Sequence, residues 1–456
     1  MKHFRRKMQA ENNFNSKQKS KETNQMKYKP FLYYLLTIAI LFCASINIQA
    51  QRDPLPASEN VVLQWNRVIE QTIRSGVHPS ATIFPIRPYA MVHAAMFDAV
   101  NSIDKSYTPY LIEVDASPNA SIDAAAATAA HGVLVGLYPT RQAALDTELA
   151  RSLASVPEDQ VRPGMIVGLI VAAKMLDFRS NDGWNVPPPP YVLPPTPGNW
   201  QPTPPAFSPA TFTHTPGVMM FALLSNKQFD PGPPPALTSA RYAADFNEVK
   251  AIGSVNSTTR TAEQTQIAQL WSPVNTTTTL WFTWNSVARG AAIRRNLSTV
   301  ESARLFALLN IAAHDAHMTS MTSKFEYGLW RPVTAIRRAD EDGNPLTDPD
   351  SNWLSLLATP PYPAYAGNQA TYGMVYATML TSFFGPDNIS FDNTWLGAAG
   401  FPDLTRSYTS FLEMAQEQAD SRIYGGIHFR FDSEAGQEIG RNTANYLFRN
   451  LMTPRN

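Results

Sequence analysis

The chain has 456 residues, of which 44% are hydrophobic, so it can bury a core as one large domain or two medium ones. Lysine plus arginine and aspartate plus glutamate balance at 37 each, which gives a formal net charge of zero at pH 7. The only cysteine, Cys43, lies near the N-terminus, which excludes a disulfide-stabilised scaffold and leaves packing alone to hold the core.

The first 50 residues predict an export signal. Residues 1–30 carry nine lysines and arginines but only two acids, and the apolar run FLYYLLTIAILFCA follows at 31–44. This order is typical of a secretory signal, which we expect to be cleaved near Ala50, with translation starting at Met1 or Met26. A retained membrane anchor is the alternative, but the run is shorter than the ~20 residues that a span needs.

Cleavage near Ala50 would also change the net charge, which bears on the partners that are expected. It would remove nine cations and two acids, leaving 28 cations against 35 acids and a charge of about −7. A chain of this charge is not expected to bind nucleic acid or an anionic membrane. We therefore expect a periplasmic or extracellular protein with a small-molecule substrate and no stable membrane partner, either as a monomer or as a homo-oligomer.

Apolar residues recur at helical spacing in most long segments, and no segment sustains the alternation of a strand. An N-terminal bundle within residues 51–185 would hold helices over 59–75, 86–103, 121–136, 140–154 and 162–178. A C-terminal bundle within residues 238–456 would hold helices over 238–251, 260–271, 283–294, 300–322, 370–383, 407–423 and 433–451. The pattern predicts an all-α fold of two helical bundles.

Proline is concentrated between these two bundles, in residues 186–237. The runs VPPPPYVLPPTPGNWQPTPPAFSP and DPGPPPAL cannot be helical. Aromatic residues, including Trp184, Trp200 and Phe207, interleave with the prolines. We therefore expect an ordered, extended wrap that connects the bundles and covers the functional site.

Three cations in the C-terminal bundle are of the kind that binds a phosphate-shaped oxyanion. Arg331 and Arg422 offer planar forks that can bind two oxygens of a tetrahedral anion, and Lys324 adds a compact point charge. His428, six residues after Arg422, is the one nearby group that could bond to the central atom. Asp432 would lie one turn from His428 on a helix, where it can bind the second ring nitrogen and fix the tautomer.

The spacing of these residues, Lys-x6-Arg-Pro and then Ser-Arg-x5-His-x3-Asp, resembles the paired signatures of the superfamily of vanadium-dependent haloperoxidases and type 2 phosphatidic acid phosphatases. AMVHAAMFDAVNSI at 90–103 and LLNIAAHDAHMTSMTSKFEYGLWRPVTAI at 308–336 are similar to its bacterial haloperoxidase branch, and the resemblance covers most of residues 58–452. It implies the family's two-bundle fold and a vanadate cofactor, or the phosphate or diphosphate group of a substrate in its place.

The resemblance also implies roles for single residues. The family's lysine and two arginines bind the vanadate oxygens, and these roles fall on Lys324, Arg331 and Arg422. The family's last histidine is the axial vanadate ligand or, in phosphatases, the phosphoryl-accepting nucleophile, and this role falls on His428. The family pattern also implies that Asp315, and Ser421 next to Arg422, lie just outside the residues that contact the anion.

The middle motif departs from the family, which reads Pro-Ser-Gly-His where this chain has Ala366, Gly367, Asn368 and Gln369. Gly367 and Asn368 would still border the oxyanion, and Gln369 would take the place of the histidine that moves protons. An amide donates hydrogen bonds but does not titrate near neutral pH, so Gln369 cannot act as a general acid or base. The site is therefore expected to bind its anion with altered chemistry.

Other histidines allow a second interpretation. His314, Asp315 and His317 could form part of a metal site, although such a site needs further ligands that the sequence does not single out. Packing in the core or behind the oxyanion site is the simpler expectation for them. His93 and His131 lie in alanine-rich segments and are expected to be buried partners of backbone or carboxylate groups.

Three functions fit the sequence. The flanking resemblance favours a vanadate-dependent haloperoxidase that oxidises halide with hydrogen peroxide. A phosphate- or diphosphate-ester enzyme, either an acid phosphatase or a diphosphate-releasing lyase or cyclase, is the alternative, because a leaving diphosphate needs little general acid. The third is a non-catalytic oxyanion-binding protein.

Overall fold

The computed structural model describes residues 59–77, 85–272, 280–385, 389–395 and 404–455. The predicted export signal and its cleavage near Ala50 lie outside the described residues and stay predictions. Within the described ranges, no helix combines the length and the apolar character that crossing a membrane requires.

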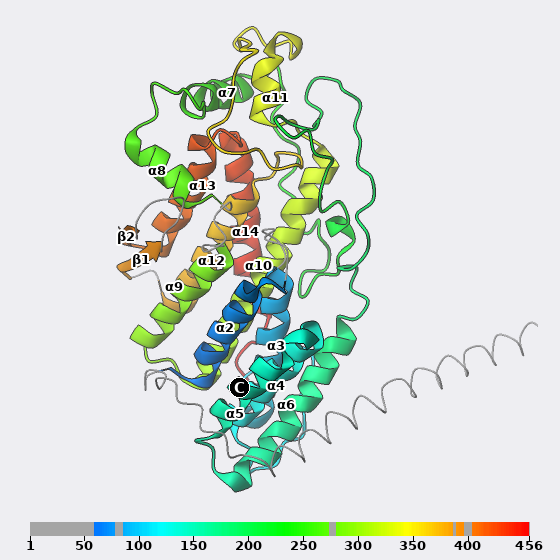
Figure 1. Ribbon diagram of the computed structural model, residues 1–456, viewed down its shortest axis with the longest axis vertical. Coiled ribbons are helices and arrows are strands. Elements are labelled where there is room, and N and C mark those ends of the chain that lie inside the picture. Colours follow the sequence, from blue (N-terminus) through cyan, green and yellow to red (C-terminus); the bar gives the residue numbers. More distant parts are fainter. Residues whose placement is uncertain (1–58, 78–84, 273–279, 386–388, 396–403, 456) are drawn as a thin grey trace, which may run out of the picture. The chain divides into compact units, whose positions relative to one another are not determined.

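The predicted helices of the N-terminal half all form (Figure 1). Helix α4 packs against α3, α5 and α6, and α3 also packs against α10 of the C-terminal half. The proposed division into 51–185, 186–237 and 238–456 stays a prediction. The bounds are α2 (Val61–Thr72), α3 (Ile86–Asp104), α4 (Ile122–Leu137), α5 (Gln142–Leu153) and α6 (Glu158–Phe178), with a short π-helix at Ile73–Val77 and a 3-10 turn at Pro139–Arg141.

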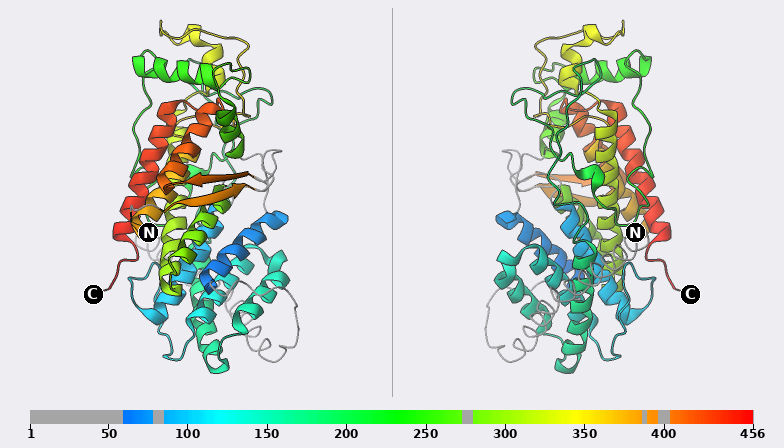
Figure 2. Two further views of the ribbon diagram at one scale, coloured as in Figure 1. Left: turned by 90° about the vertical axis from the view of Figure 1, so that its left-hand side faces the viewer. Right: turned by 90° about the vertical axis from the view of Figure 1, so that its right-hand side faces the viewer.

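In the C-terminal half, helix α12 packs against α9, α10, α13 and α14, as the views in Figures 1 and 2 show. This mostly helical architecture confirms the predicted all-α class. The bounds are α7 (Ala240–Ile252), α8 (Ala262–Leu270), α9 (Leu280–Arg294), α10 (Thr299–Tyr327), α11 (Pro332–Arg337), α12 (Asn368–Phe384), α13 (Phe411–Tyr424) and α14 (Arg430–Asn450).

Three short elements were not predicted. The strands β1 (Phe391–Trp395) and β2 (Leu404–Tyr408) pair antiparallel, in a part of the chain where the sequence shows no sustained alternation. Alternate residues of β1 are buried, which is the strand pattern, but five residues are too few to stand out by periodicity. Helix α11, six residues long, is missed for the same reason.

Helix α10 forms the centre of the molecule and carries the first predicted cation. It begins at Ser298, whose side chain accepts from the Glu301 backbone while Glu301 reaches back to the Ser298 backbone. All residues from 302 to 324 are buried. The prediction ended this helix at residue 322, but it continues to Tyr327, so Lys324 lies on its last turn and inside the core. Polar residues near this end break the apolar pattern without ending the helix.

Residues 179–239 join α6 to α7 without an α-helix and run along α10 (Figures 1 and 2). The Trp200 backbone N–H donates to the Gly328 carbonyl at 2.7 Å, and the Tyr191 hydroxyl donates to the Phe325 carbonyl at 3.1 Å. The ring of Phe212 lies 6.2 Å from that of Tyr362, in the segment that carries the middle motif. The proline-rich segment is therefore an ordered wrap, as predicted.

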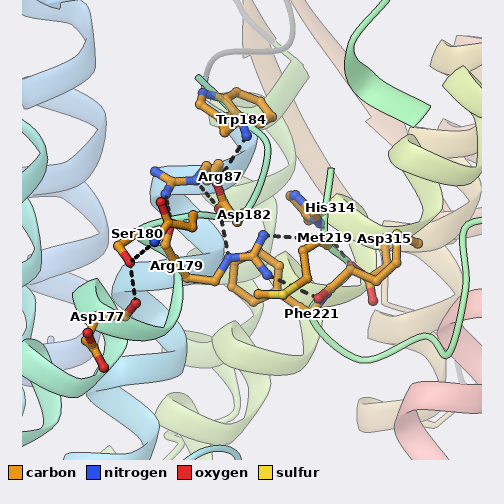
Figure 3. A network of polar contacts seen from close by, with 12 residues as sticks. Arg87, Asp177, Arg179, Ser180, Asp182, Trp184, Met219, Phe221, His314 and Asp315 are labelled. Carbon is orange, nitrogen blue, oxygen red and sulfur yellow. Dashed lines mark hydrogen bonds and ion pairs between the residues drawn. The ribbon is translucent and has the colours of Figure 1, made fainter. Parts of the chain in front are cut away.

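A buried ionic network joins the start of this wrap to a later part of it (Figure 3). The Arg179 guanidinium donates to the Asp182 carboxylate at 2.9 Å and to the carbonyls of Met219 and Met220 at 2.7 and 3.1 Å. Arg87 on α3 donates to the same carboxylate at 2.6 Å. Burial opposes ionisation of Asp182, but Arg87 and Arg179 outweigh it and lower the pKa of this carboxyl below its ordinary value.

Candidate functional site

The structure brings the three predicted cations and His428 into one buried region. Lys324 comes from the last turn of α10, Arg331 from the start of α11, and Arg422 from the last turn of α13. His428 lies in the turn between α13 and α14. Their exposed fractions are 0%, 0%, 3% and 4% respectively, so water does not compensate these charges. We call this group of four residues the cation cluster.

Glycines and a carboxylate set the position of the His428 ring. Helix α13 ends at Gly425, and Gly426 follows with φ +74°, close to the Gly253 carbonyl, where a side chain would collide. The Asp432 carboxylate accepts from the Phe429 backbone N–H at 3.0 Å and lies 3.0 Å from His428 Nδ1. A carboxylate at Nδ1 selects the tautomer that carries its proton there, so Nε2 presents a lone pair.

Arg331 faces this lone pair directly. Its Nη1 lies 3.1 Å from His428 Nε2 and also donates to the Ile427 carbonyl at 2.8 Å. Burial, followed by the charges of Arg331, Lys324 and Arg422, lowers the pKa of His428 well below its ordinary value. The ring is therefore neutral at physiological pH, which is the form that can donate its lone pair to an electrophilic centre.

Several N–H groups of the cation cluster lack acceptors among the described residues. Arg331 Nη2 and Arg422 Nε are buried and have no hydrogen-bond partner. Leaving a buried charged donor unpaired costs about 1–3 kcal/mol or more, so an acceptor at this place would be stabilising. The cluster thus has the unused donors and the positive charge that an oxyanion of phosphate shape requires, beside a ring nitrogen that only Arg331 Nη1 contacts among the described residues.

Lys324 is held differently from the arginines. Its Nζ donates to the carbonyls of Ala364 and Ala366 at 2.6 and 2.5 Å, in the segment that leads into the middle motif. Burial, and then the charge of Arg331, lowers the pKa of Lys324 well below its ordinary value, while Asp432 opposes this shift. Burial also raises the pKa of Asp432 to about 7. A bound anion would favour the charged form of Lys324.

The middle motif lies where α12 begins. The Gly367 N–H donates to the Asp432 carbonyl at 2.7 Å, which ties the motif to the residue that orients His428. Helix α12 starts at Asn368, so its first N–H groups have no partner within the helix. Gln369 is buried, and its Oε1 has no hydrogen-bond partner among the described residues.

Asn368 does not present a free side chain to an anion. Its Oδ1 accepts from Ser320 at 2.6 Å, its Nδ2 donates to Met321 Sδ at 3.1 Å, and it also hydrogen-bonds the Tyr362 hydroxyl. Its amide is therefore used by α10 and Tyr362, which leaves the backbone N–H as its contact with an oxyanion. The prediction that Asn368 binds the anion therefore applies only to its backbone N–H group.

Asp315 and Ser421 do not reach the cation cluster. Asp315 accepts from the backbone N–H groups of Phe221, Ala222 and Leu223 at 2.7–2.8 Å, and Figure 3 shows its carboxylate beside His314. Ser421 donates to the Gln418 carbonyl at 2.6 Å. Their predicted place behind the anion site stays a prediction, and each side chain binds backbone groups rather than a residue of the cation cluster.

The metal alternative gains no support from the described residues, where no group of three or more His, Cys, Asp or Glu side chains could hold an ion. His131 is the buried partner of a carboxylate, as expected, whereas His93 pairs with a side-chain amide instead of a backbone or carboxylate group. His93 Nε2 lies 2.8 Å from Asn66 Nδ2, and His131 Nε2 lies 2.7 Å from Asp146.

Tyr362 belongs to the site although the sequence did not single it out. Its ring centroid lies 5.1 Å from the Arg331 guanidinium carbon and 5.6 Å from Lys324 Nζ. Its carbonyl accepts from Arg331 Nε at 2.8 Å. Burial raises the pKa of Tyr362, while Arg331 and Arg422 oppose the shift. The signal available was its place in the proline-tyrosine stretch before the middle motif, which does not by itself distinguish a site residue from a core aromatic.

We expect Arg422→Ala to weaken phosphate binding by roughly 10-fold or more, because a charged hydrogen bond contributes about 1.5–3 kcal/mol. The matched control is Arg430→Ala, which removes a guanidinium that pairs instead with Glu248 and Asp420. Calorimetric titration with phosphate measures both. Equal affinity in the two variants would show that Arg422 is structural.

We also expect anion affinity to fall as pH rises. Burial lowers the pKa of Lys324 in the free protein, and a bound anion raises it again, so binding takes up a proton between the two values. Sulfate is the appropriate probe because its own charge is constant across neutral pH. Sulfate affinity measured from pH 6 to pH 9 should decrease with pH in the wild type and depend less on pH in Lys324→Met. A pH-independent wild type would contradict the assignment.

Comparisons with known proteins agree with this geometry. A family model described as the second helical-bundle domain of vanadium chloroperoxidase matches residues 304–456. Vanadium chloroperoxidase from Curvularia inaequalis is 27% identical over 275 residues, a match that covers 47% of this chain and only 44% of that relative. The matched family domain contains all four residues of the cation cluster.

Solved structures share the fold over most of the chain. A bacterial vanadium-dependent iodoperoxidase superposes with a TM-score of 0.73 at 24% identity and covers 89% of this chain and 100% of its own. The holo form of a bacterial vanadium-dependent chloroperoxidase gives a TM-score of 0.68 at 16% identity and covers 88% of this chain and 99% of its own. The predicted fold class is thereby confirmed: the chain has the helical fold of the vanadium-dependent haloperoxidases, and its C-terminal part is similar in sequence to vanadium chloroperoxidase.

Proposed function

We propose that this protein is an exported, vanadate-dependent haloperoxidase that oxidises halide with hydrogen peroxide. The observation that supports this most is the His428 Nε2 lone pair, oriented by Asp432 at 3.0 Å and set among buried cations with unused N–H groups. An oriented neutral imidazole beside an oxyanion-binding cluster is what a vanadate ligand requires. Similarity to haloperoxidases favours vanadate over other oxyanions.

Each residue of the cation cluster would make a different contact with vanadate. Arg331 Nη2 and Arg422 Nε would donate to its oxygens, and Lys324 would offset its negative charge. His428 Nε2 would bond to vanadium, with Arg331 Nη1 turned from the ring to an oxygen. Vanadate, when bound, supplies a Lewis-acidic centre that activates hydrogen peroxide toward halide. The substrates in this proposal are hydrogen peroxide and a halide ion.

A combined binding and activity measurement tests the proposal. The purified chain is incubated with orthovanadate, freed of excess by gel filtration, and assayed for vanadium by elemental analysis. The loaded protein is then assayed with hydrogen peroxide and iodide, bromide or chloride, with unloaded protein as the control. One vanadium per chain with vanadium-dependent halide oxidation supports the proposal, and a loaded but inactive protein would contradict it.

Gln369 favours one second candidate, a phosphate- or diphosphate-ester enzyme. The amide of Gln369 does not titrate, so position 369 provides no general acid or base. Expulsion of a diphosphate needs less proton donation than oxidation of halide by peroxide does. The same preparation is therefore assayed for release of phosphate or diphosphate from ester substrates. Ester cleavage that vanadate inhibits, without halide oxidation, would select this function.

A further inference from the structure

A second buried histidine lies close to the cation cluster and has no assigned function. His317 on α10 is fully buried, and its Nδ1 forms a hydrogen bond with the hydroxyl of Tyr372 on α12. The two rings stack with centroids 4.9 Å apart and planes 12° apart. Trp281 packs edge-on against both rings, with centroids 6.3 Å from His317 and 3.9 Å from Tyr372. The pair is thus held firmly between three helices.

Helix spacing places this pair on the faces of α10 and α12 that also carry Lys324 and Gln369. Tyr372 follows Gln369 by three residues in α12, and residues at this spacing share one face of a helix. His317 precedes Lys324 by seven residues on α10, which is about two turns and again the same face. The charge of Lys324 acts on His317, and that of Tyr362 acts on Tyr372. Both residues are therefore electrostatic neighbours of the cluster.

One ring nitrogen of His317 is unused. Its Nε2 is buried without a hydrogen-bond partner among the described residues, as is Gln369 Oε1. An unpaired buried polar atom costs about 1–3 kcal/mol unless water or a ligand satisfies it. The titratable groups that face the ring are His314 and Lys324 from α10 and Tyr372 from α12, while α9 contributes the uncharged Trp281. Burial, then His314 and Lys324, keeps His317 neutral in the free protein by lowering its pKa.

We propose that the His317–Tyr372 pair holds the proton that halide oxidation consumes, in the role that the amide of Gln369 cannot fill. The inference rests on the proposed haloperoxidase function. In that reaction halide and hydrogen peroxide take up one proton and give hypohalous acid and water. The O–O bond breaks, halide loses two electrons to it, and the released oxygen leaves as water with the proton that the pair supplied. His317 then recovers a proton from solvent.

Anion binding favours protonation of His317 in the pair. A negative charge in the cluster neutralises the effect of Lys324, so His317 becomes easier to protonate when the site is filled. The proton is thus loaded only when the site is occupied. The free enzyme thus avoids a further buried positive charge near Lys324.

Nuclear magnetic resonance of histidine-selectively 15N-labelled protein tests this without any turnover. The His317 signals are assigned by their loss in His317→Gln, and pH titrations are recorded without and with saturating phosphate. We expect phosphate to raise the titration midpoint of His317 by about one pH unit or more. If phosphate binds but the titration midpoint of His317 does not change, this inference is wrong while the proposed function still stands. Failure of phosphate to bind overturns the proposed function and, with it, this inference.

Variants provide the second measurement. His317→Gln and Tyr372→Phe keep size and shape, so vanadium content should be unchanged while halide oxidation falls by about 10²- to 10⁴-fold in His317→Gln. Adding Gln369→His to His317→Gln should restore at least about 10-fold of that loss, because a proton donor then stands at the family's position. A structural defect would not be rescued in this way. Vanadium-loaded His317→Gln with nearly full activity would overturn the inference, and Tyr372→Phe provides the same test if His317→Gln does not fold.

Discussion

Replacement of His428 by alanine is expected to abolish vanadate binding while phosphate affinity changes little. Vanadium would lose the one side chain placed to bond it, whereas phosphate in the unreacted state is held mainly by Lys324, Arg331 and Arg422. Loss of an outer partner of a metal ligand typically costs about 10- to 100-fold in affinity, so loss of the ligand itself should cost more. Calorimetry with phosphate and elemental analysis after vanadate loading measure the two effects separately.

Asp432→Asn is the matched control for this prediction. It keeps an oxygen near His428 Nδ1 but removes the carboxylate charge, so vanadate affinity should fall by about 10- to 100-fold rather than vanish. Phosphate affinity should again be nearly unchanged. Retention of full vanadate affinity in His428→Ala would mean that the anion is held by the cations alone, and the proposed role of His428 as a vanadate ligand would have to be abandoned.

Asp315→Ala is expected to lower the free energy of unfolding by about 3–5 kcal/mol. The Asp315 carboxylate accepts three consecutive backbone N–H groups of the wrap at 2.7–2.8 Å and is itself fully buried. Removing it leaves those donors without an acceptor in a place that water does not reach freely. Denaturant titration at neutral pH, followed by intrinsic tryptophan fluorescence, measures the change.

An exposed contact of the same wrap gives the comparison. Lys227 pairs with Glu326 at 2.7 Å, but the two side chains are 57% and 35% exposed. An ion pair at such a position contributes only about 0–1 kcal/mol, so Glu326→Ala should be nearly neutral. A similar small loss in Asp315→Ala would show that the wrap is held by its prolines and aromatic rings, with little contribution from the buried carboxylate.

The sequence was sufficient for the helices and for the identity of the cations. The apolar periodicity placed every long helix because burial of one face imposes a repeat of about 3.6 residues, which survives in the amino-acid order. Lys324, Arg331, Arg422 and His428 could be identified because their spacing resembles the paired signatures of the haloperoxidase superfamily. Short elements escaped, since the five residues of β1 contain too little of a repeat.

Only the tertiary structure decided which polar side chains are free for chemistry. Asn368 and Gln369 are neighbours in sequence, yet α10 uses the amide of the first, and the second keeps an unpaired oxygen. Asp315 and His317 lie on one turn of α10, but the carboxylate binds the wrap while the ring joins Tyr372. The hydrogen bonds of a side chain depend on which neighbouring segment packs against it. That partner comes from a segment far away in the chain, so local sequence carries no record of it.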